Sequence, residues 1–429
     1  MSVTGRSHLD AREARHFQGY PLPGPRDGGP RDGGRRFIAL ICAGLFFFGP
    51  TIALSLGAHL ARFENRELAT FGDPRQGWPW LAMLPAWAGD HLPFRDVAVH
   101  ATEVLSRDVF GEPAVFGPRG EHRSAGPAVA SAQQPAAVEF PSVIEGRDGW
   151  LYLGADVSGA CAPSRPLDDT LSSLRRLRTA VELSGRQFVL VVAPDKTTMV
   201  PEHLPVSYLG RDCSVRARDE FWRRVAAETG AIDLRPALAE ITRHKGAPIY
   251  YPADTHWSQE GGLVMTYAMA DRVYSGITRT WQVTPAGSIP WSDDISPLIG
   301  RSGERTIPIY SLAPDGQQDR VRSIASDFRM PLSLTAAPTV GTVDQPVRMI
   351  ADSFTQFASR YLAAAFTDIT IVHPETVAAA PGPAGELLSG GKVVVLQVAE
   401  RNLLSGASPI LLQPVITELS NQLARHPPH

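Results

Sequence analysis

Residues 187–194 read QFVLVVAP, an uninterrupted apolar run that ends at a proline. A strand without polar alternation is typical of a parallel sheet whose two faces are both covered by helices. Comparable apolar runs occur in PVRMIADSF (346–354), TDITIV (367–372) and KVVVLQVAERN (392–402). Because helical patterns alternate with these runs, the sequence predicts an α/β sandwich built around a mainly parallel sheet.

The segments around these runs complete a predicted domain over residues 141–429. GWLYLG (149–154) has the bulky side chains of a short strand. Residues 282–345 are rich in Pro, Gly and Ser, and predict an irregular surface insertion. Apolar residues at helical spacing predict helices over 168–185, 217–230, 258–276 and about 413–425.

The N-terminal residues predict export and a membrane anchor. Residues 37–60 (FIALICAGLFFFGPTIALSLGAHL) carry no acidic, lysine or arginine side chain. At about 1.5 Å per residue the run is long enough to cross a hydrocarbon core of about 30 Å. Arg35 and Arg36 precede it, so the positive-inside rule leaves the N-terminus in the cytoplasm and the later residues outside. A cleavable signal peptide that ends near residue 58 is the alternative.

The composition of the flanking segments and of the whole chain narrows the setting. Residues 1–36 are rich in Gly, Pro and Arg and predict a disordered cytoplasmic tail, and residues 61–140 predict a juxtamembrane helical segment followed by a linker. A net charge of -3 gives no support for a nucleic-acid partner. Cys161 and Cys213 can pair in an oxidising compartment, although the sequence does not fix their distance. The chain has no CxxC motif or Cys/His cluster, so a zinc site is not expected.

A second stretch, YYPADTHWSQEGG (250–262), crowds an acid and an imidazole into a loop before a helix. Ser353 sits where the strand in VRMIADSF should end, at the edge of the sheet where ligands bind. A serine needs a base to become a nucleophile, and His256 is a candidate for that base. Asp254 is then the candidate acid that orients the imidazole and stabilises its protonated form.

Both segments also have structural interpretations. An Asp-Ser pair before a helix is an ordinary N-cap, and such caps vastly outnumber catalytic serines. A single histidine in a loop is more often a hydrogen-bonded structural residue. The two segments gain weight as catalytic candidates because both fall at predicted strand ends of one α/β domain.

Several motifs together carry a family resemblance. IADSF (350–354) resembles the nucleophile block of SGNH hydrolases, with DTHW (254–257) roughly a hundred residues upstream. DGWLYLG, APDK, SDDISPLIG and VAERNL occur in comparable positions. The chain therefore resembles the SGNH hydrolase-like domain of alginate O-acetyltransferases of the AlgJ/AlgX type, from about residue 62 to 403. The resemblance implies an SGNH-like three-layer sandwich.

The resemblance also implies roles for individual residues. Ser353 matches the nucleophile, His256 the general base and Asp254 the orienting acid. Ala351 stands where the family usually has glycine, and no GxND element supplies an asparagine donor for the oxyanion.

Other residues near these motifs have two interpretations each. Lys196 either binds substrate or forms a surface bridge. Glu400 and Arg401 follow a predicted strand, and a structural ion pair is favoured over substrate binding by Arg401. Trp257, like Trp150 and Tyr152, either stacks on sugar rings or packs in the core, and packing is the commoner outcome.

The implied function is that of an exported, membrane-anchored O-acyltransferase, most simply an O-acetyltransferase, that modifies hydroxyl groups of a polysaccharide. The resemblance implies a partner that supplies acyl groups across the membrane, a multi-pass membrane-bound O-acyltransferase. The chemistry requires no metal and no cofactor. A carbohydrate esterase with the same three residues and a non-catalytic polysaccharide-binding scaffold are the alternatives. A metal site on Asp254 and His256 lacks further clustered ligands in the sequence.

Overall fold

The computed structural model describes residues 140–324 and 326–428, together with residues 48, 49, 52, 53, 56, 87, 91, 101, 102 and 104–106. The chain divides into two units, and the first, Met1–Leu60 with His91–Pro93, contains few described residues. The predicted tail (1–36) and nearly all of the predicted span (37–60) and juxtamembrane segment (61–140) lie outside the described residues. Within the part of the chain that is described, no helix is both long and apolar enough to cross a membrane.

The second unit is built around a six-stranded sheet, which confirms the predicted mainly parallel α/β arrangement. Its strand order is β4-β3-β10-β8-β9-β7, and every neighbouring pair is parallel except β7 with β9. The strands are β3 Gln187–Ala193, β4 Ile232–Asp233, β7 Leu332–Thr335, β8 Val347–Ala351, β9 Asp368–Val372 and β10 Val393–Ala399.

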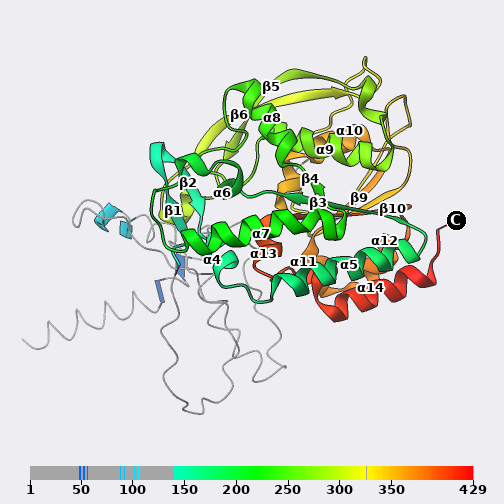
Figure 1. Ribbon diagram of the computed structural model, residues 1–429. Helices are drawn as coiled ribbons and strands as arrows, with labels where there is room; N and C mark the ends of the chain where they lie inside the picture. Colours follow the sequence, from blue (N-terminus) through cyan, green and yellow to red (C-terminus); the bar gives the residue numbers. More distant parts are fainter. Residues whose placement is uncertain are drawn as a thin grey trace, which may run out of the picture. The chain divides into compact units, whose positions relative to one another are not determined.

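Helices cover both faces of this sheet (Figure 1), which explains why the central strands are apolar throughout. In β3, Val189 and Val191 pack into one core cluster while Leu190 and Val192 pack into the other. The helices are α4 Ala155–Cys161, α5 Leu167–Leu183, α6 Lys196–Met199, α7 Arg211–Thr229, α8 Arg235–Lys245, α9 Gln259–Val273, α10 Ser359–Ala365, α11 Pro374–Ala379, α12 Pro381–Ser389, α13 Glu400–Leu404 and α14 Gln413–Arg425.

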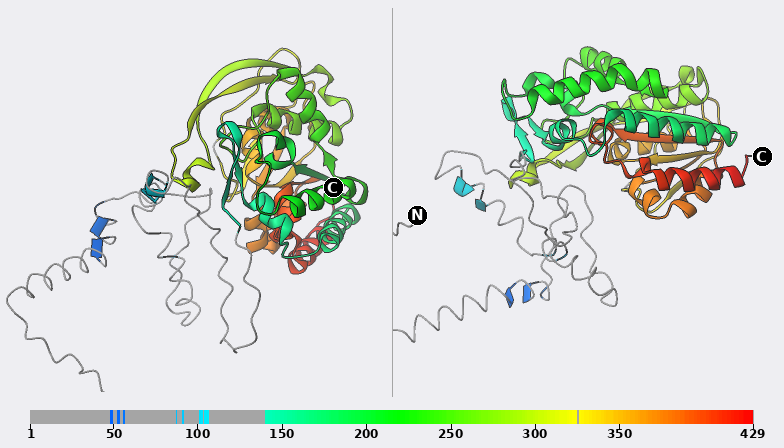
Figure 2. Two further views of the ribbon diagram at one scale, coloured as in Figure 1. Left: turned by 60° about the vertical axis from the view of Figure 1, so that its left-hand side comes forward. Right: turned by 60° about the horizontal axis from the view of Figure 1, so that its bottom comes forward.

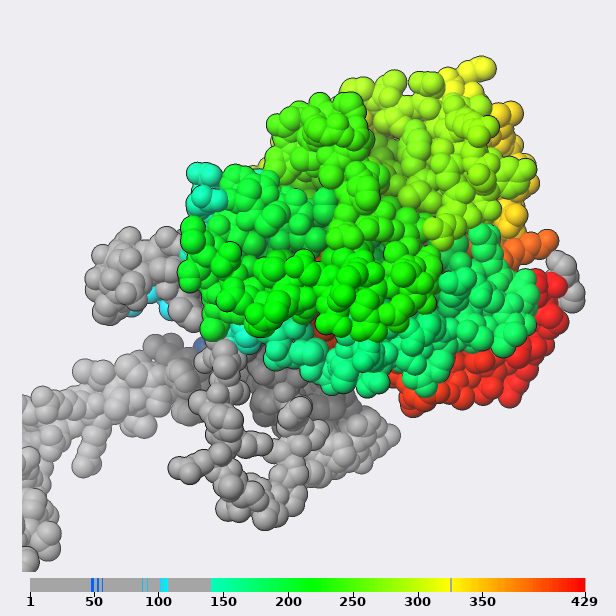
Figure 3. Space-filling model, viewed as in Figure 1, coloured from blue at the N-terminus to red at the C-terminus, as the bar shows by residue number. Residues whose placement is uncertain are grey.

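Each face has its own set of helices. The buried side chains of α5, α7, α12 and α14 belong to one hydrophobic cluster. Figure 3 shows the outer surfaces of α5, α7 and α14 side by side. Helices α8, α9 and α10 join the other cluster together with β6 (Glu304–Ala313). The predicted helices over 168–185, 217–230, 258–276 and 413–425 all exist, with ends shifted by a few residues.

The prediction of an irregular insertion over residues 282–345 is wrong. Strand β5 (Gln282–Ser292) pairs with β6 in a long antiparallel hairpin, seen as a curved ribbon in Figure 2. The same segment also contributes β7 to the main sheet. Strand β5 carries two prolines and is mostly exposed, so it shows none of the apolar alternation by which strands are recognised.

A second small hairpin pairs β1 (Val143–Glu145) with β2 (Leu151–Leu153). The loop of the larger hairpin, residues 293–303, docks against it. Ile295, Leu298 and Ile299 of that loop form a small core with Val143 and Leu151. Both ends of the larger hairpin are therefore anchored, because Trp281 at its other end is buried in the main core.

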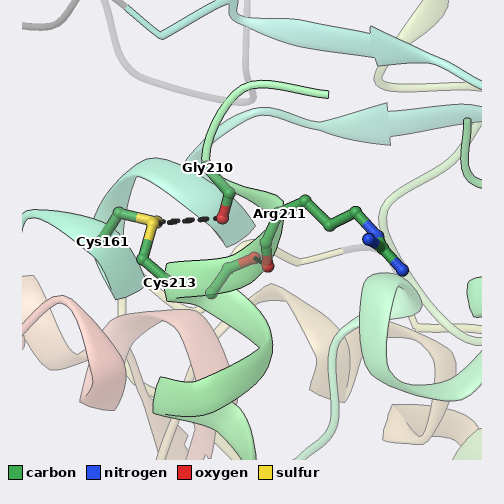
Figure 4. The surroundings of a disulfide bond; sticks show 5 residues. Cys161, Gly210, Arg211 and Cys213 are labelled. Atoms are coloured by element: carbon green, nitrogen blue, oxygen red, sulfur yellow. Dashed lines mark hydrogen bonds between the residues drawn. A yellow bond between two sulfur atoms is a disulfide. The ribbon is translucent and has the colours of Figure 1, made fainter. Parts of the chain in front are cut away.

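Cys161 and Cys213 form a disulfide bond, the pairing that the sequence left open (Figure 4). Their Cα atoms are 5.3 Å apart and the bond joins the end of α4 to the first turn of α7. The carbonyl oxygen of Gly210, just before α7, lies 3.1 Å from the Cys161 sulfur. Gly210 has a φ of 83°, and an added Cβ would collide with Val157 of α4, so the close packing of these two helices requires glycine here.

Candidate active site

Ser353 lies at the carboxyl end of β8 and begins a short 3-10 helix, η7 (Ser353–Phe357). Its neighbour Asp352 caps this helix by accepting a hydrogen bond from the Phe354 N–H at 3.1 Å. The cap interpretation of Asp352-Ser353 is therefore correct, and it is compatible with a nucleophile at Ser353. Ser353 is partly exposed, so a reactant can reach its hydroxyl.

The turn at Ser353 is fastened to the neighbouring strand β10. Gln397, fully buried in that strand, accepts hydrogen bonds from the Asp352 N–H at 3.1 Å and from the Thr355 hydroxyl at 2.8 Å. Its amide donates back to Asp352 at 2.9 Å. The Ala399 N–H donates to the other oxygen of Asp352 at 2.6 Å. This network explains why a polar residue interrupts the apolar run VVVLQVA.

The three predicted triad residues lie in hydrogen-bonded order. His256 Nε2 is 2.8 Å from Ser353 Oγ, and His256 Nδ1 is 2.8 Å from Asp254 Oδ1. A carboxylate at Nδ1 selects the tautomer with a proton on Nδ1, which leaves Nε2 free to accept the serine proton. The side chains of His256 and Asp254 are 4% and 1% exposed, so this acid–base pair is shielded from water.

The DTHW loop adopts the non-helical backbone that the convergence of Asp254 and His256 requires. The bridge between Tyr250 and Trp257 closes the loop, and Asp254 Oδ1 also accepts the His256 backbone N–H at 2.9 Å. The following helix α9 packs closely on η7, because an added Cβ at Gly262 would collide with the Phe357 backbone. The glycines of SQEGG thus bring the histidine loop up to the serine turn.

Burial and charge act against each other at this pair. Burial lowers the pKa of His256, but the hydrogen bond and charge of Asp254, with the charge of Asp294, outweigh it and raise the pKa overall. Burial likewise raises the pKa of Asp254, but hydrogen bonds and charge from His256, with the indole of Trp291, hold that pKa below its usual value. The pair is therefore stabilised in the state with a charged Asp254.

Sequence reasoning missed two residues of the site, both from the β5–β6 hairpin. The indole Nε1 of Trp291 donates to Asp254 Oδ2 at 2.7 Å. Asp294 accepts the Thr255 N–H at 2.7 Å and places a carboxylate oxygen 3.4 Å from His256 Nδ1. The acidic pair in SDDISPLIG is the available signal in the sequence, but the Pro, Gly and Ser content of residues 282–345 masks it.

Asp294 also corrects the view that Asp254 and His256 lack a third potential metal ligand. One ligand atom from each of these residues lies within 4.8 Å of the others. The carboxylate oxygens already accept hydrogen bonds from N–H and O–H donors: Asp254 from His256 and Trp291, and Asp294 from Thr255. Because these oxygens are already hydrogen-bonded, the three residues suit the binding of a proton between His256 and Asp254 better than the binding of a metal cation.

Lys196 has neither of its predicted roles, because its side chain is buried. Its ammonium group donates to three backbone carbonyls of the histidine loop, those of Tyr251 at 3.1 Å, Pro252 at 2.9 Å and Asp254 at 2.7 Å. Burial lowers the pKa of Lys196 to about 8. An ammonium group has three N–H donors, so all three are used within the protein, and the prediction of a surface bridge is wrong.

Glu400 is buried and Arg401 is partly buried, but each pairs with other residues. Arg401 Nη1 is 2.8 Å from Asp195 Oδ1, and its guanidinium lies over the Phe354 ring at 5.2 Å. Glu400 accepts the Asp195 N–H at 2.9 Å and the Thr198 hydroxyl. The predicted Glu400–Arg401 pair is thus replaced by a wider ionic network below the serine turn. The side chain of Arg401 remains 15% exposed.

The aromatic residues proposed as sugar platforms pack inside the protein. Trp257 is fully buried and its indole donates to the Phe354 carbonyl at 3.1 Å. Tyr152 is also fully buried, and Trp150 is 7% exposed. The packing interpretation is correct for all three. Trp291, by contrast, is partly exposed beside the site.

The serine turn offers a backbone donor to an oxyanion. Among the described residues, the Ser353 N–H has no hydrogen-bond acceptor. Asn402 follows β10 and its amide lies 3.4 Å from Asp352, next to the serine. Preorganised N–H groups of this kind stabilise negative charge that develops on a carbonyl oxygen.

The site combines a serine at the carboxyl edge of a mainly parallel sheet with a histidine and an aspartate from a neighbouring loop. This arrangement is typical of serine-dependent hydrolases and acyltransferases. Residues 143–288 match the family model described as "SGNH hydrolase-like domain, acetyltransferase AlgX", a stretch that includes Asp254 and His256. "Probable alginate O-acetylase AlgJ" of Pseudomonas aeruginosa is 30% identical over 200 residues, which cover 42% of this chain and 49% of the relative. The namesake from Pseudomonas putida is 24% identical over 193 residues, covering 42% and 47%. Over part of its length the chain is therefore similar to the AlgJ/AlgX family of SGNH hydrolase-like acetyltransferases.

The matched region spans about half the length of these curated relatives. Among solved structures, the "O-Acetyltransferase Domain of Pseudomonas putida AlgJ" is similar with a TM-score of 0.43 and 17% identity, covering 66% of this chain and 99% of that chain. The structure of Pseudomonas aeruginosa AlgX is similar with a TM-score of 0.44 and 12% identity, covering 66% of each chain. The similarity to the AlgJ/AlgX family rests on the sequence matches.

Proposed function

We propose that the protein is an O-acetyltransferase that acts on hydroxyl groups of a polysaccharide through an acetyl-serine intermediate on Ser353. One observation carries the proposal, namely the continuous hydrogen-bonded line from Asp254 through His256 to Ser353 with two links of 2.8 Å. The relatives are described as probable alginate O-acetylases, which supports acetyl as the group and a polysaccharide as its acceptor.

In the first half-reaction, Ser353 Oγ attacks the acetyl carbonyl of a donor. The serine proton passes to His256 Nε2, which is positioned for it at 2.8 Å. The Ser353 N–H is available to the oxyanion of the tetrahedral intermediate. When the intermediate collapses, the bond from the acetyl carbon to the donor oxygen breaks, and that oxygen takes the proton from His256.

In the second half-reaction, the acceptor hydroxyl attacks the acetyl-serine. His256 Nε2 removes the proton of that hydroxyl, the bond from the acetyl carbon to Ser353 Oγ breaks, and the proton returns to Ser353. Asp254 stays ionised and stabilises the imidazolium formed in each half. The product is an acetyl ester of the sugar and free enzyme.

Water in place of the sugar hydroxyl would make the same protein an esterase. The partial exposure of Ser353 favours this second candidate, because water reaches the acetyl-serine unless an acceptor excludes it. The two activities share every residue named above, and the acceptor alone separates them. The assembled triad gives less support to a purely non-catalytic scaffold.

The proposal includes an extracytoplasmic site tethered by the predicted span over residues 37–60. The disulfide between Cys161 and Cys213 supports this location, because such bonds persist in oxidising compartments. Acetyl groups then have to arrive across the membrane. A multi-pass membrane-bound O-acyltransferase is the proposed partner that delivers them.

The test is acetylation of the full-length protein in detergent. We expect 4-nitrophenyl acetate to label Ser353, seen by mass spectrometry, and acetyl-free alginate oligosaccharide to remove the label as a sugar ester. Ser353→Ala and His256→Ala should lower turnover by about 10⁴- to 10⁶-fold. Asp254→Asn should lower it by about 10⁴-fold, because the imidazole then adopts the wrong tautomer.

Ser207→Ala is the matched control, since Ser207 is an exposed serine outside the site. Labelling that persists in folded Ser353→Ala would exclude the proposed nucleophile. Labelling of Ser353 with release only to water, for every polysaccharide supplied, would leave an esterase.

A further inference from the structure

The second carboxylate beside the histidine, that of Asp294, has no part in the mechanism described so far. Asp294 lies in the loop after β5, 40 positions beyond Asp254. The side chain is only 14% exposed. A carboxylate in such a place is costly unless its partners compensate for the lost water, so its contacts indicate what it is for.

Among the described residues, the hydrogen bonds and the ion pair of the Asp294 carboxylate are with the acid–base loop. One oxygen accepts the backbone N–H of Thr255 at 2.7 Å, and the other accepts the Thr255 hydroxyl. The same oxygen lies 3.4 Å from His256 Nδ1. The hydroxyl of Thr255 is itself 3.3 Å from Nδ1. Asp294 therefore holds the residue between the acid and the base, and faces the same ring nitrogen as Asp254.

The two carboxylates differ in what they bind. Asp254 makes the short bond to Nδ1 at 2.8 Å. Its carboxylate also accepts hydrogen bonds from the His256 N–H and the Trp291 indole. Asp294 has no short bond to the ring, and its donors both belong to Thr255. Asp254 thus determines the tautomer, while Asp294 determines the shape of the turn and adds a second negative charge behind the ring.

We propose that Asp294 is a positioning residue of the serine–histidine–aspartate site, which fixes the turn through Thr255 and strengthens His256 as a base. The inference rests on the proposed function for its effect on rate. Its effect on the imidazole itself is independent of any reaction. Because Asp294 belongs to the β5–β6 hairpin, this hairpin becomes part of the catalytic apparatus, together with its Trp291.

The charged groups that face His256 come from several elements. Asp254 lies in its own loop, Asp294 in the hairpin loop and Arg401 in α13. Lys196 of α6 binds the loop backbone next to Asp254. Aromatic rings also pack against the imidazole, including that of Phe354 of η7 at 5.0 Å between ring centroids. Burial and the charge of Asp254 raise the pKa of Asp294. In its ionised form Asp294 is the second anion near the ring, and its removal leaves the positive charge of Arg401 less opposed.

The sign of the effect follows from these charges. A nearby anion favours the protonated imidazole and raises its pKa, by amounts up to 1–3 pH units at about 4–6 Å. Replacing Asp294 by asparagine keeps an oxygen for Thr255 but removes the charge. The pKa of His256 should therefore fall, and the acidic limb of kcat/KM should move to lower pH by at least about 0.5 unit.

The experiment measures His256 directly in the full-length protein. Histidine labelled with ¹³C is titrated by NMR in a Ser353→Ala background, with and without Asp294→Asn. Because Ser353→Ala has no nucleophile, the titration answers the question even if the proposed acetyl transfer fails. In the active protein, the pH profile of 4-nitrophenyl acetate turnover is compared for the same substitution.

Two further variants separate charge from shape. Thr255→Val removes the hydroxyl contact and keeps the charge of Asp294, so kcat should fall by about tenfold while the His256 midpoint stays near that of the wild type. Asp293→Asn is the matched control, because the neighbouring Asp293 binds Arg305 and does not contact the histidine. An unchanged His256 midpoint in folded Asp294→Asn, or an equal shift in Asp293→Asn, would overturn the proposal.

Discussion

The two halves of the site are built in different ways. The serine half is an extension of the sheet. Ser353 follows β8 after one intervening residue, Asp352, and Gln397 and Ala399 of β10 fasten its turn. The histidine half is a loop outside the sheet, closed by the bridge between Tyr250 and Trp257. The nucleophile therefore inherits the rigidity of the core, whereas the base depends on contacts made to its loop.

Those contacts come from residues far away in the sequence. Lys196 reaches the Asp254 carbonyl across 58 positions, Trp291 reaches the Asp254 carboxylate across 37, and Asp294 reaches Thr255 across 39. Each of these residues binds part of the loop that the others leave free. We therefore expect damage to the loop contacts to reduce activity more than stability, and damage to the serine turn to do the reverse.

Among the changes to the histidine loop, Lys196→Met should have the largest effect, because it removes three hydrogen bonds at once. The Tyr251 and Pro252 carbonyls retain other donors, and the loss of a buried charge offsets part of the cost. We expect unfolding free energy to fall by no more than about 2 kcal/mol. Turnover should fall by about 10²-fold, because a displacement of about 1 Å at the acid costs that much.

Lys392→Met is the control for this change, since Lys392 is an exposed lysine of the same chain. Chemical denaturation gives the stability and 4-nitrophenyl acetate turnover gives the rate. A Lys196→Met protein that loses stability heavily but retains its turnover would show that the lysine supports the fold alone.

The serine half is broken most directly by Gln397→Leu. This change leaves the Asp352 N–H and the Thr355 hydroxyl without an acceptor inside the core, at a cost of about 2–4 kcal/mol in unfolding free energy. The turn keeps its contacts to the Ala399 N–H and to Phe354, so turnover of the folded protein should fall by only about tenfold.

Chemical denaturation and 4-nitrophenyl acetate turnover are measured again, and the loss of rate relative to the loss of stability is compared between the two variants. A larger rate loss in Gln397→Leu than in Lys196→Met would contradict the view that the serine turn is the better supported half.

The same contrast explains what could be predicted from the sequence. The strand runs, the position of Ser353 at a strand end and the pairing of Asp254 with His256 all depend on local pattern, and the structure shows each of them. Ser353 could be placed because the end of an apolar run indicates where a buried strand reaches the carboxyl edge of the sheet. The disulfide was foreseen as a possibility because only two cysteines remain outside the predicted span.

What could not be predicted depends on long-range contacts. Strand β5 has prolines and exposed side chains, so the sequence of its hairpin shows no apolar pattern. Because the hairpin is not predicted, the positions of Trp291 and Asp294 beside the histidine are not predicted either. Lys196 resembles a surface lysine until the fold surrounds it with three carbonyls. Arg401 sits next to Glu400 in the chain but turns to Asp195 across 206 positions. Partners of buried charges are chosen by the fold, and adjacency in the sequence is a poor guide to them.

The smallest effect on activity is expected at the disulfide, which lies in neither half of the site. Cys161 and Cys213 close a loop with a sequence separation of 52, and the chain-entropy model gives such a bond about 4 kcal/mol of unfolding free energy. Replacing both by serine should lower stability by about that amount, while turnover of the folded protein changes by less than about twofold. Thiol counting provides the check on pairing, since the chain has 3 cysteines and the native protein should show one free thiol, that of Cys42. A rate loss as large as that of Lys196→Met would mean that α4 transmits strain to the site through Asp156, which lies 3.9 Å from Arg401.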